Sequence, residues 1–163
     1  MTIGDYSRFD VSNYVNATFD GLYLPHMGDR AFNALHATVP AHSPIKIWSY
    51  YQIYLLAKQS LHVEGEFFEC GVFRGGSASF IAKVIAGHGR RFHLFDTFTG
   101  MPECDPAHDP LHVQGDFDDV SIHEVRALVG HESFVHFHPG KIPDTFAGME
   151  DCKISFAHVD VDI

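Results

Sequence analysis

The 163-residue sequence has few cysteines, no long apolar run and no leader pattern, and each shortage excludes a class of protein. Its cysteines, Cys70, Cys104 and Cys152, form no CxxC pair and leave one unpaired in any disulfide scheme. This favours a reducing, cytoplasmic setting over a disulfide scaffold. No window approaches the roughly 18 apolar residues of a membrane span. The N-terminus lacks the basic flank and apolar core of a signal peptide.

Basic residues are also scarce, at 11 lysines and arginines against 21 acidic residues, which gives a formal net charge of -10. A binder of duplex nucleic acid needs a cationic surface that displaces counterions, so this class is disfavoured and a small-molecule ligand is expected. The 13 histidines are mostly scattered. His136 and His138 fall on one face of a predicted strand, and a histidine zinc site stays a minor alternative.

Alternating strand-like and helix-like segments indicate an α/β fold. Strand-like runs occupy 66–73, 91–96, 133–138 and 153–160, and helical patterns occupy 43–59, 75–87 and 121–130. Such alternation is typical of a parallel sheet wound by right-handed crossovers. Ser43 is the predicted N-cap of the first helix, and Ser121 that of the last. We expect a single domain over 1–163, with a helical N-terminal extension over 1–62 and the core over 63–163.

A glycine-rich turn follows the first predicted strand, in the stretch ECGVFRGGS. Its chemistry-bearing residues are Glu69, Gly71, Gly75, Gly76 and Ser77. In open α/β sheets the ligand lies beyond the carboxyl ends of the strands. Glycines there either let a ligand approach the backbone or simply allow a tight turn to pack a helix on the sheet. The sequence leaves both interpretations open.

The spacing within this turn disfavours two common ligands. A dinucleotide fingerprint needs glycine where this chain has Phe73, and a P-loop needs a lysine that the stretch RGGS lacks. A nicotinamide oxidoreductase is therefore a weaker alternative. Glu69 can accept from an ammonium group, while the N–H groups at the helix start can receive a carboxylate. An amino-acid moiety carries both groups.

Acidic residues further along the chain suit a nucleoside. Asp96 ends the second predicted strand, where a carboxylate can accept both hydroxyls of a ribose. In the long loop that follows, Asp116 can accept from an exocyclic amine, and Phe117 offers an apolar surface to a base. Amino acid, ribose and adenine together describe S-adenosylmethionine.

Five ordered motifs carry a resemblance to a known family: FFECGVFRGGSASF, LFDTFTGMPE, GDF, PGKIPDTF and HVDVDI. They resemble the macrocin O-methyltransferase (TylF/MycF) family, whose members use S-adenosylmethionine and a divalent metal to methylate sugar hydroxyls in antibiotic biosynthesis. The resemblance implies a three-layer Rossmann-like methyltransferase sheet with strand order 3-2-1-4. The implied cofactor contacts are Glu69, Cys70, Gly71, Gly75, Gly76, Ser77, Asp96, Thr97, Phe98, Asp116 and Phe117.

The resemblance also implies a metal site at the end of the fourth strand. The first aspartate after this strand, Asp160, is the expected ligand to Mg²⁺ and the expected base that deprotonates the acceptor hydroxyl. Asp162 is the alternative ligand. A divalent cation lowers the pKa of a bound hydroxyl and orients it for attack on the methyl group, and oxygen ligands favour Mg²⁺.

The sequence departs from the family pattern after its fourth strand, because methyltransferases of this fold have seven strands. We therefore expect a fragment that holds the cofactor-binding half, with little or no activity alone. The expected acceptor is a hydroxylated, glycosylated small molecule, and homo-oligomers are possible. A binding module that keeps the nucleoside pocket without catalysis is the main alternative.

Overall fold

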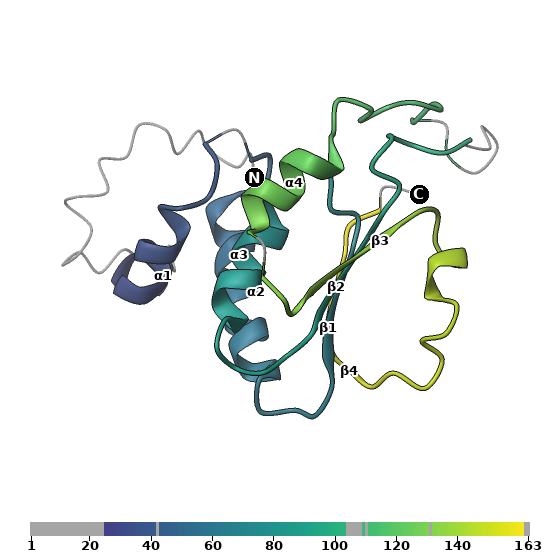
Figure 1. Ribbon diagram of the computed structural model, residues 1–163. Helices are drawn as coiled ribbons and strands as arrows, with labels where there is room; N and C mark the ends of the chain where they lie inside the picture. The colour runs from purple at the N-terminus through teal and green to yellow at the C-terminus, as the bar shows by residue number, and fades with distance from the viewer. Residues whose placement is uncertain (1–24, 42, 104–108, 110, 131, 162–163) are drawn as a thin grey trace.

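A parallel sheet forms the centre of the computed structural model, which describes residues 25–41, 43–103, 109, 111–130 and 132–161. Its strands are β1 (Glu66–Cys70), β2 (Phe92–Asp96), β3 (Val135–Pro139) and β4 (Ile154–Val159). They are hydrogen-bonded in the order β3-β2-β1-β4, and every neighbouring pair is parallel. The predicted α/β class and the strand order 3-2-1-4 are confirmed (Figure 1).

The four α-helices of the described residues lie together on one side of this sheet (Figure 1). The helices are α1 (Arg30–His36), α2 (Ile47–Ser60), α3 (Gly76–Ile85) and α4 (Ile122–Val129), with the 3-10 turns η3 (Pro25–Gly28) and η4 (Asp144–Phe146). In the described part of the chain, none of these helices is long and apolar enough to cross a membrane. The N-terminal extension is helical as expected, from residue 25 onward.

The two faces of the sheet are buried to different extents because alternate strand residues point to opposite sides. Phe67 on β1 pairs in register with Phe92 and Phe156, and these rings belong to the large core beneath the helices. On the opposite face Phe68 and Phe95 belong to a smaller cluster. In the described residues, the connector between β3 and β4, including η4, covers this second face. The expected second helical layer is not among them.

Helix α2 begins one turn later than predicted. Its N-cap is Lys46, in extended conformation, and no side chain caps it. The predicted cap, Ser43, instead forms a hydrogen bond of 2.8 Å with the Tyr50 hydroxyl, so its side chain ties the lead-in segment to the helix. Helix α4 does start after Ser121 and end before Gly130 as predicted, although Ser121 makes no capping hydrogen bond.

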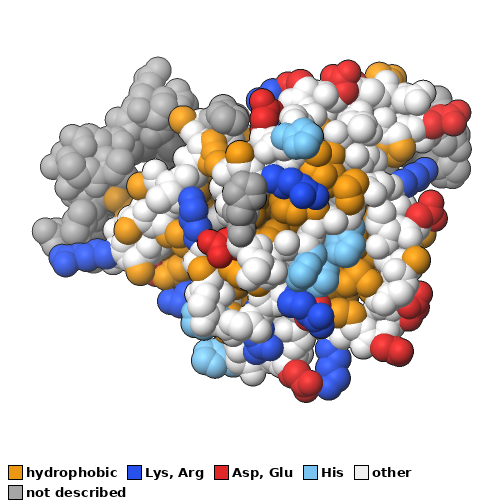
Figure 2. Space-filling model, in the orientation of Figure 1, with side chains coloured by type: hydrophobic (Ala, Val, Ile, Leu, Met, Phe, Trp, Pro, Cys, Tyr) orange, Lys and Arg blue, Asp and Glu red, His pale blue; other side chains and the backbone are white. Residues whose placement is uncertain are grey.

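Three polar side chains form a hydrogen-bonded chain across β3, β2 and β1. Nδ1 of His93 lies 2.9 Å from Nε2 of His138, and Nε2 of His93 lies 2.5 Å from Oε2 of Glu66. Figure 2 shows histidine side chains gathered among hydrophobic ones near the middle of the face in view. Within the described ranges, no group of three His, Cys, Asp or Glu side chains could hold a metal ion, so the zinc alternative finds no support.

We expect acidification to weaken the fold through this chain of histidines. Burial lowers the pKa of His93, against the opposing effect of Glu66, and burial also lowers the pKa of His138. The unfolded chain takes up these protons near pH 6.5, and the folded chain only at lower pH. Because the unfolded state binds more protons in this window, stability falls as pH falls. The raised pKa of His158 acts in the opposite direction and reduces the effect.

Urea unfolding at about pH 7.5 and about pH 5.5 measures this difference. The variant His93→Phe should show a smaller loss of stability on acidification than the parent chain. His88→Asn is the control, because His88 is exposed and should leave the pH dependence unchanged. An unaltered pH dependence in His93→Phe would contradict the assignment.

Candidate functional site

A cavity of about 810 Å³ lies at the carboxyl ends of β1, β2 and β4, where the sheet order predicts a ligand site. Its volume falls within the range of about 300–1,000 Å³ typical of small-molecule sites. The glycine-rich turn after β1 forms its floor, and the ends of β2 and β4 flank this turn. The lead-in to α2 (residues 43–46), the α2 helix itself, and residues 140–142 after β3 close its sides.

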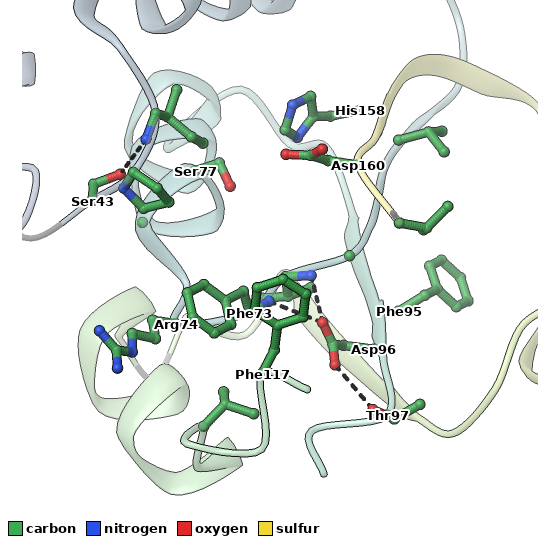
Figure 3. Close-up of a pocket in the computed structure, with 18 of the residues that line it drawn as sticks. Ser43, Phe73, Arg74, Ser77, Phe95, Asp96, Thr97, Phe117, His158 and Asp160 are labelled. Atoms are coloured by element: carbon green, nitrogen blue, oxygen red, sulfur yellow. Dashed lines mark hydrogen bonds between the residues drawn. The ribbon is translucent and has the colours of Figure 1, made fainter. Parts of the chain in front are cut away.

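Asp96, at the end of β2, joins the glycine-rich turn to the next loop. Its Oδ2 atom accepts hydrogen bonds from the backbone N–H groups of Val72 (2.6 Å) and Phe73 (2.9 Å). Its Oδ1 atom accepts from the backbone N–H of Phe98 at 2.8 Å. Figure 3 shows Asp96 between the turn that carries Phe73 and the neighbouring Thr97. The Thr97 hydroxyl also lies 3.5 Å from Oδ1, but its single hydrogen is donated to the Gly100 carbonyl oxygen at the shorter distance of 2.6 Å. An ionised carboxylate offers about four acceptor positions, so Oδ1 retains one for a ligand hydroxyl. The predicted contact with ribose is compatible with this geometry and stays a prediction.

Three phenylalanines around Asp96 adopt a left-handed backbone conformation that residues other than glycine rarely adopt. Phe73, Phe98 and Phe117 have φ values of 48°, 54° and 61°. Each such residue costs on the order of 1–3 kcal/mol and persists where the surroundings hold it in place, commonly at functional sites. The Asp96 carboxylate holds two of them through their N–H groups. Phe73 and Phe117 meet edge to face at 5.5 Å, and both line the cavity.

Gly71 lets β4 approach the turn more closely than any side chain would permit. A Cβ atom at this position would lie 1.8 Å from the backbone oxygen of Asp160, and the φ of Gly71 is +83°. The backbone N–H of Asp160 in turn donates to the carbonyl oxygen of Cys70 at 2.9 Å. The end of β4, with Asp160, is therefore packed directly on the turn.

The next two glycines of the turn also make room for protein. A Cβ atom on Gly75 would lie 2.8 Å from Cγ1 of Val125 in α4, and one on Gly76 would lie 2.9 Å from the Tyr50 hydroxyl. Of the two interpretations that the sequence left open, packing of helices on the turn accounts for both residues. Gly76 also lines the cavity.

Glu69 and His158 form a pair between neighbouring strands beneath the cavity. Glu69 is fully buried, and its Oε1 atom accepts from Nδ1 of His158 at 2.8 Å. Burial raises the pKa of Glu69. Although burial acts against it, the hydrogen bond and charge of Glu69, with the charge of Asp160, raise the pKa of His158. Figure 3 shows His158 and Asp160 next to each other at the cavity.

The structure brings about half of the predicted site residues to the cavity. Those that line it are Gly71, Gly76, Ser77, Asp96, Thr97, Phe117 and Asp160. Those that do not line it are Glu69, Cys70, Gly75, Phe98 and Asp116. Asp162 lies outside the described residues.

The predicted contacts away from the cavity have other surroundings. Glu69 lies behind His158, and the Cys70 side chain lies on the opposite face of the sheet in the smaller cluster. Phe98 is buried in the helix-side core. The Asp116 side chain accepts from the backbone N–H of Val113 at 2.9 Å, which stabilises its own loop. As placed, these side chains support the site without facing the cavity.

Several residues at the cavity were missed from the sequence. His158 precedes Asp160 by two positions on a strand, so the period of two places both on one face, and this signal could have found it. In the sequence, Phe73 is only a departure from the dinucleotide fingerprint, whereas in the structure it forms part of the cavity wall. The segment 43–46 carries no signal of a binding role, because the fold alone brings it to the turn.

The cavity suits the predicted cofactor better than the predicted metal. It has an aromatic end at Phe117 and a polar end at Ser77 and His158, which matches a nucleoside joined to an amino acid. Of the two predicted Mg²⁺ ligands, Asp160 and Asp162, the structure describes Asp160. The described residues contain no group of three metal-ligating side chains. They do not by themselves form a metal centre.

The sheet order and the placement of the cavity define a Rossmann-like methyltransferase fold. The sequence model of the family described as macrocin-O-methyltransferase (TylF) matches residues 56–163, and the chain belongs to this family.

Similar proteins agree with this assignment. The 8-demethyl-8-(2,3-dimethoxy-alpha-L-rhamnosyl)-tetracenomycin-C 4'-O-methyltransferase of Streptomyces olivaceus is 32% identical over 114 residues, which are 62% of this chain and 44% of the relative. The chain thus spans less than half the length of this relative. The O-methyltransferase NovP superposes with a TM-score of 0.66 at 26% identity, over 76% of this chain and 57% of that chain. The calicheamicin methyltransferase CalS11 (TM-score 0.60, 20% identity, 90% and 74% covered) supports the fold alone.

Replacing Gly71 with alanine should disrupt both the turn and the position of Asp160. The variant combines an unfavourable φ with a contact against the backbone atoms of Asp160, just after β4, which cannot rotate away. Gly87→Ala is a matched control, because Gly87 has a similar φ of +79° with nothing within 4 Å of its added Cβ. We expect the control to lose about 1–2 kcal/mol of stability and Gly71→Ala to lose clearly more, measured by urea unfolding. Equal losses would contradict the proposed close packing.

Proposed function

We propose that this chain binds S-adenosylmethionine in the cavity and forms the cofactor-binding part of an O-methyltransferase. The expected acceptor is a hydroxyl of a sugar or another small secondary metabolite. The observation that carries the proposal is a cavity with one aromatic and one polar end, at the carboxyl ends of β1, β2 and β4, in a member of the macrocin-O-methyltransferase family. The Streptomyces olivaceus relative, a 4'-O-methyltransferase of a rhamnosyl-tetracenomycin, supports a sugar acceptor.

The two ends of the cavity suggest how the cofactor lies. Phe117, whose side chain is 43% exposed, and Phe73 offer apolar ring surface to an adenine base. Asp96, adjacent to both, keeps acceptor capacity on Oδ1 for a ribose hydroxyl. The amino-acid part then extends toward Ser77 and His158, where polar groups and the start of α3 can receive its charges. The methyl group would be delivered near the end of β4.

Asp160 is the group that we assign to proton transfer. When bound, S-adenosylmethionine supplies an electrophilic methyl group on a sulfonium sulfur. The Asp160 carboxylate, which lines the cavity, would accept the proton of the acceptor hydroxyl as that oxygen forms its bond to the methyl carbon. The carbon–sulfur bond breaks, its electron pair stays on sulfur, and the thioether product is neutral.

A divalent metal is a narrower part of the proposal and comes from the family resemblance. Mg²⁺ in proteins is usually held by one or two carboxylates with several waters and substrate oxygens, and the described residues offer Asp160. The proton transfer described above uses no metal. We expect EDTA to abolish methyl transfer by the complete enzyme and added Mg²⁺ to restore it. Full activity in EDTA would overturn the metal requirement without affecting the cofactor site.

Calorimetry with S-adenosylhomocysteine tests the cofactor site directly. We expect binding at one site per chain, and we expect Phe117→Ala to weaken it by about tenfold, within the range of about 1–3 kcal/mol for a base stacked on an aromatic ring. Leu111→Ala is the control, because this residue is a more exposed apolar side chain of the same loop and does not line the cavity. The absence of binding by the parent chain would count against the proposal.

A further inference from the structure

A buried carboxylate beneath the cavity has a position that packing alone does not explain. Glu69 is fully buried, and among the described residues its Oε2 atom has no hydrogen bond of normal geometry, although the Ser77 hydroxyl lies near enough to lower the pKa of Glu69 against the larger, opposite effect of burial. Burying an ionisable group costs several kcal/mol unless its polar atoms are satisfied. Phe67, two residues earlier on the same face of β1, is completely buried in the helix-side core. An apolar side chain at position 69 would likewise avoid the free-energy cost of burying a carboxylate. The carboxylate therefore calls for a role other than packing.

The partner of Glu69 is a side chain that does face the cavity. Glu69 and His158 are directly opposite each other on β1 and β4, and the bond from Nδ1 to Oε1 measures 2.8 Å. We assign the shared hydrogen to Nδ1, with Glu69 as its ionised acceptor, because an ionised carboxylate only accepts hydrogen bonds. This fixes the plane of the ring and leaves Nε2 as the second polar atom. Among the described residues, Nε2 has no hydrogen-bond partner, and His158 lines the cavity (Figure 3).

We propose that Glu69 is a positioning residue that holds His158 by Nδ1, so that Nε2 of His158 contacts the amino-acid end of the bound cofactor. The inference rests on the proposed function, because it requires the cofactor to lie with this end at β4. It reassigns the direct contact that the sequence predicted for Glu69 to the histidine in front of it. Residues that orient a histidine through its second nitrogen are a common means of fixing how the ring meets its ligand.

The surroundings of the pair support a binding role. Ser77, in the first turn of α3, is nearly buried and also lines the cavity, so the ring nitrogen and this hydroxyl border the same end. Asp160, directly after the end of β4, also lines the cavity and lies beside His158 (Figure 3). The amino-acid end carries an ammonium and a carboxylate, and this cluster offers a hydrogen-bonding group to each. At the other end of the cavity, the rings of Phe73 and Phe117 offer no such partner.

Two ligands separate a contact at the amino-acid end from a general effect on the cavity. S-adenosylhomocysteine carries this end, and 5′-methylthioadenosine lacks it. We expect Glu69→Met and His158→Phe each to weaken binding of S-adenosylhomocysteine by about tenfold, the size of one hydrogen bond to a charged group. Binding of 5′-methylthioadenosine should stay within about twofold in both variants. Glu69→Gln, which keeps an oxygen acceptor for Nδ1, should retain most of the affinity.

The double variant tests whether Glu69 acts through His158. Because the two residues are proposed to form one contact, Glu69→Met combined with His158→Phe should be no weaker than His158→Phe alone. Nitrogen-15 NMR of the His158 ring gives a readout independent of affinity: its Nδ1 signal should shift in Glu69→Met and be largely restored in Glu69→Gln.

Equal weakening of both ligands, full additivity in the double variant, or an unchanged Nδ1 signal in Glu69→Met would overturn the positioning role. If the parent chain binds neither ligand, the proposed function itself fails. If the parent chain binds both ligands with the same affinity, the contact at the amino-acid end is refuted and the nucleoside site stands.

Discussion

The cavity depends on the three backbone hydrogen bonds that the Asp96 carboxylate accepts, from Val72, Phe73 and Phe98. These bonds join the turn after β1 to the loop after β2, and they hold two residues in a left-handed backbone conformation. Hydrogen bonds to a charged acceptor contribute about 1.5–3 kcal/mol each, enough to offset the cost of that conformation. A residue that the sequence suggested as a ligand contact is thus first a structural junction of the site.

Around this junction the site consists of two parts with different origins. The turn and the strand ends are set by the backbone, since Gly71 and Gly76 allow β4 and Tyr50 to approach without intervening side chains. The remaining wall comes from residues 43–46 and α2, held to the turn through Ser43 and Tyr50. Backbone packing therefore sets one part of the site, and side-chain hydrogen bonding sets the other.

Much of the fold followed from the sequence because its signals are local. Apolar runs and glycine stops located the strands and the later helices, and alternation of the two implied a parallel sheet. The predicted start of α2 was wrong because the Ser43 side chain bonds to Tyr50, seven residues away, instead of capping the helix. Residue preferences at helix N-caps do not reveal such a contact. The site residues were predicted from their positions in motifs, and the structure places some of them at the cavity and others behind it. A motif does not say which face of a strand a side chain occupies. Glu69 and Cys70 show this directly, since they are neighbours on β1 that point to opposite faces.

The contact between Gly71 and the backbone of Asp160 also bears on the precision of the site. The separation between the glycine-rich turn and the Cα atom of Asp160, the proposed catalytic carboxylate, is set by main chain against main chain, so no rotamer change in either strand can alter it. Groups carried on rigid elements keep their geometry to fractions of an ångström, which transfer reactions require. The short side chain of Asp160 can still rotate about its own bonds, and His158 lies on one side of it.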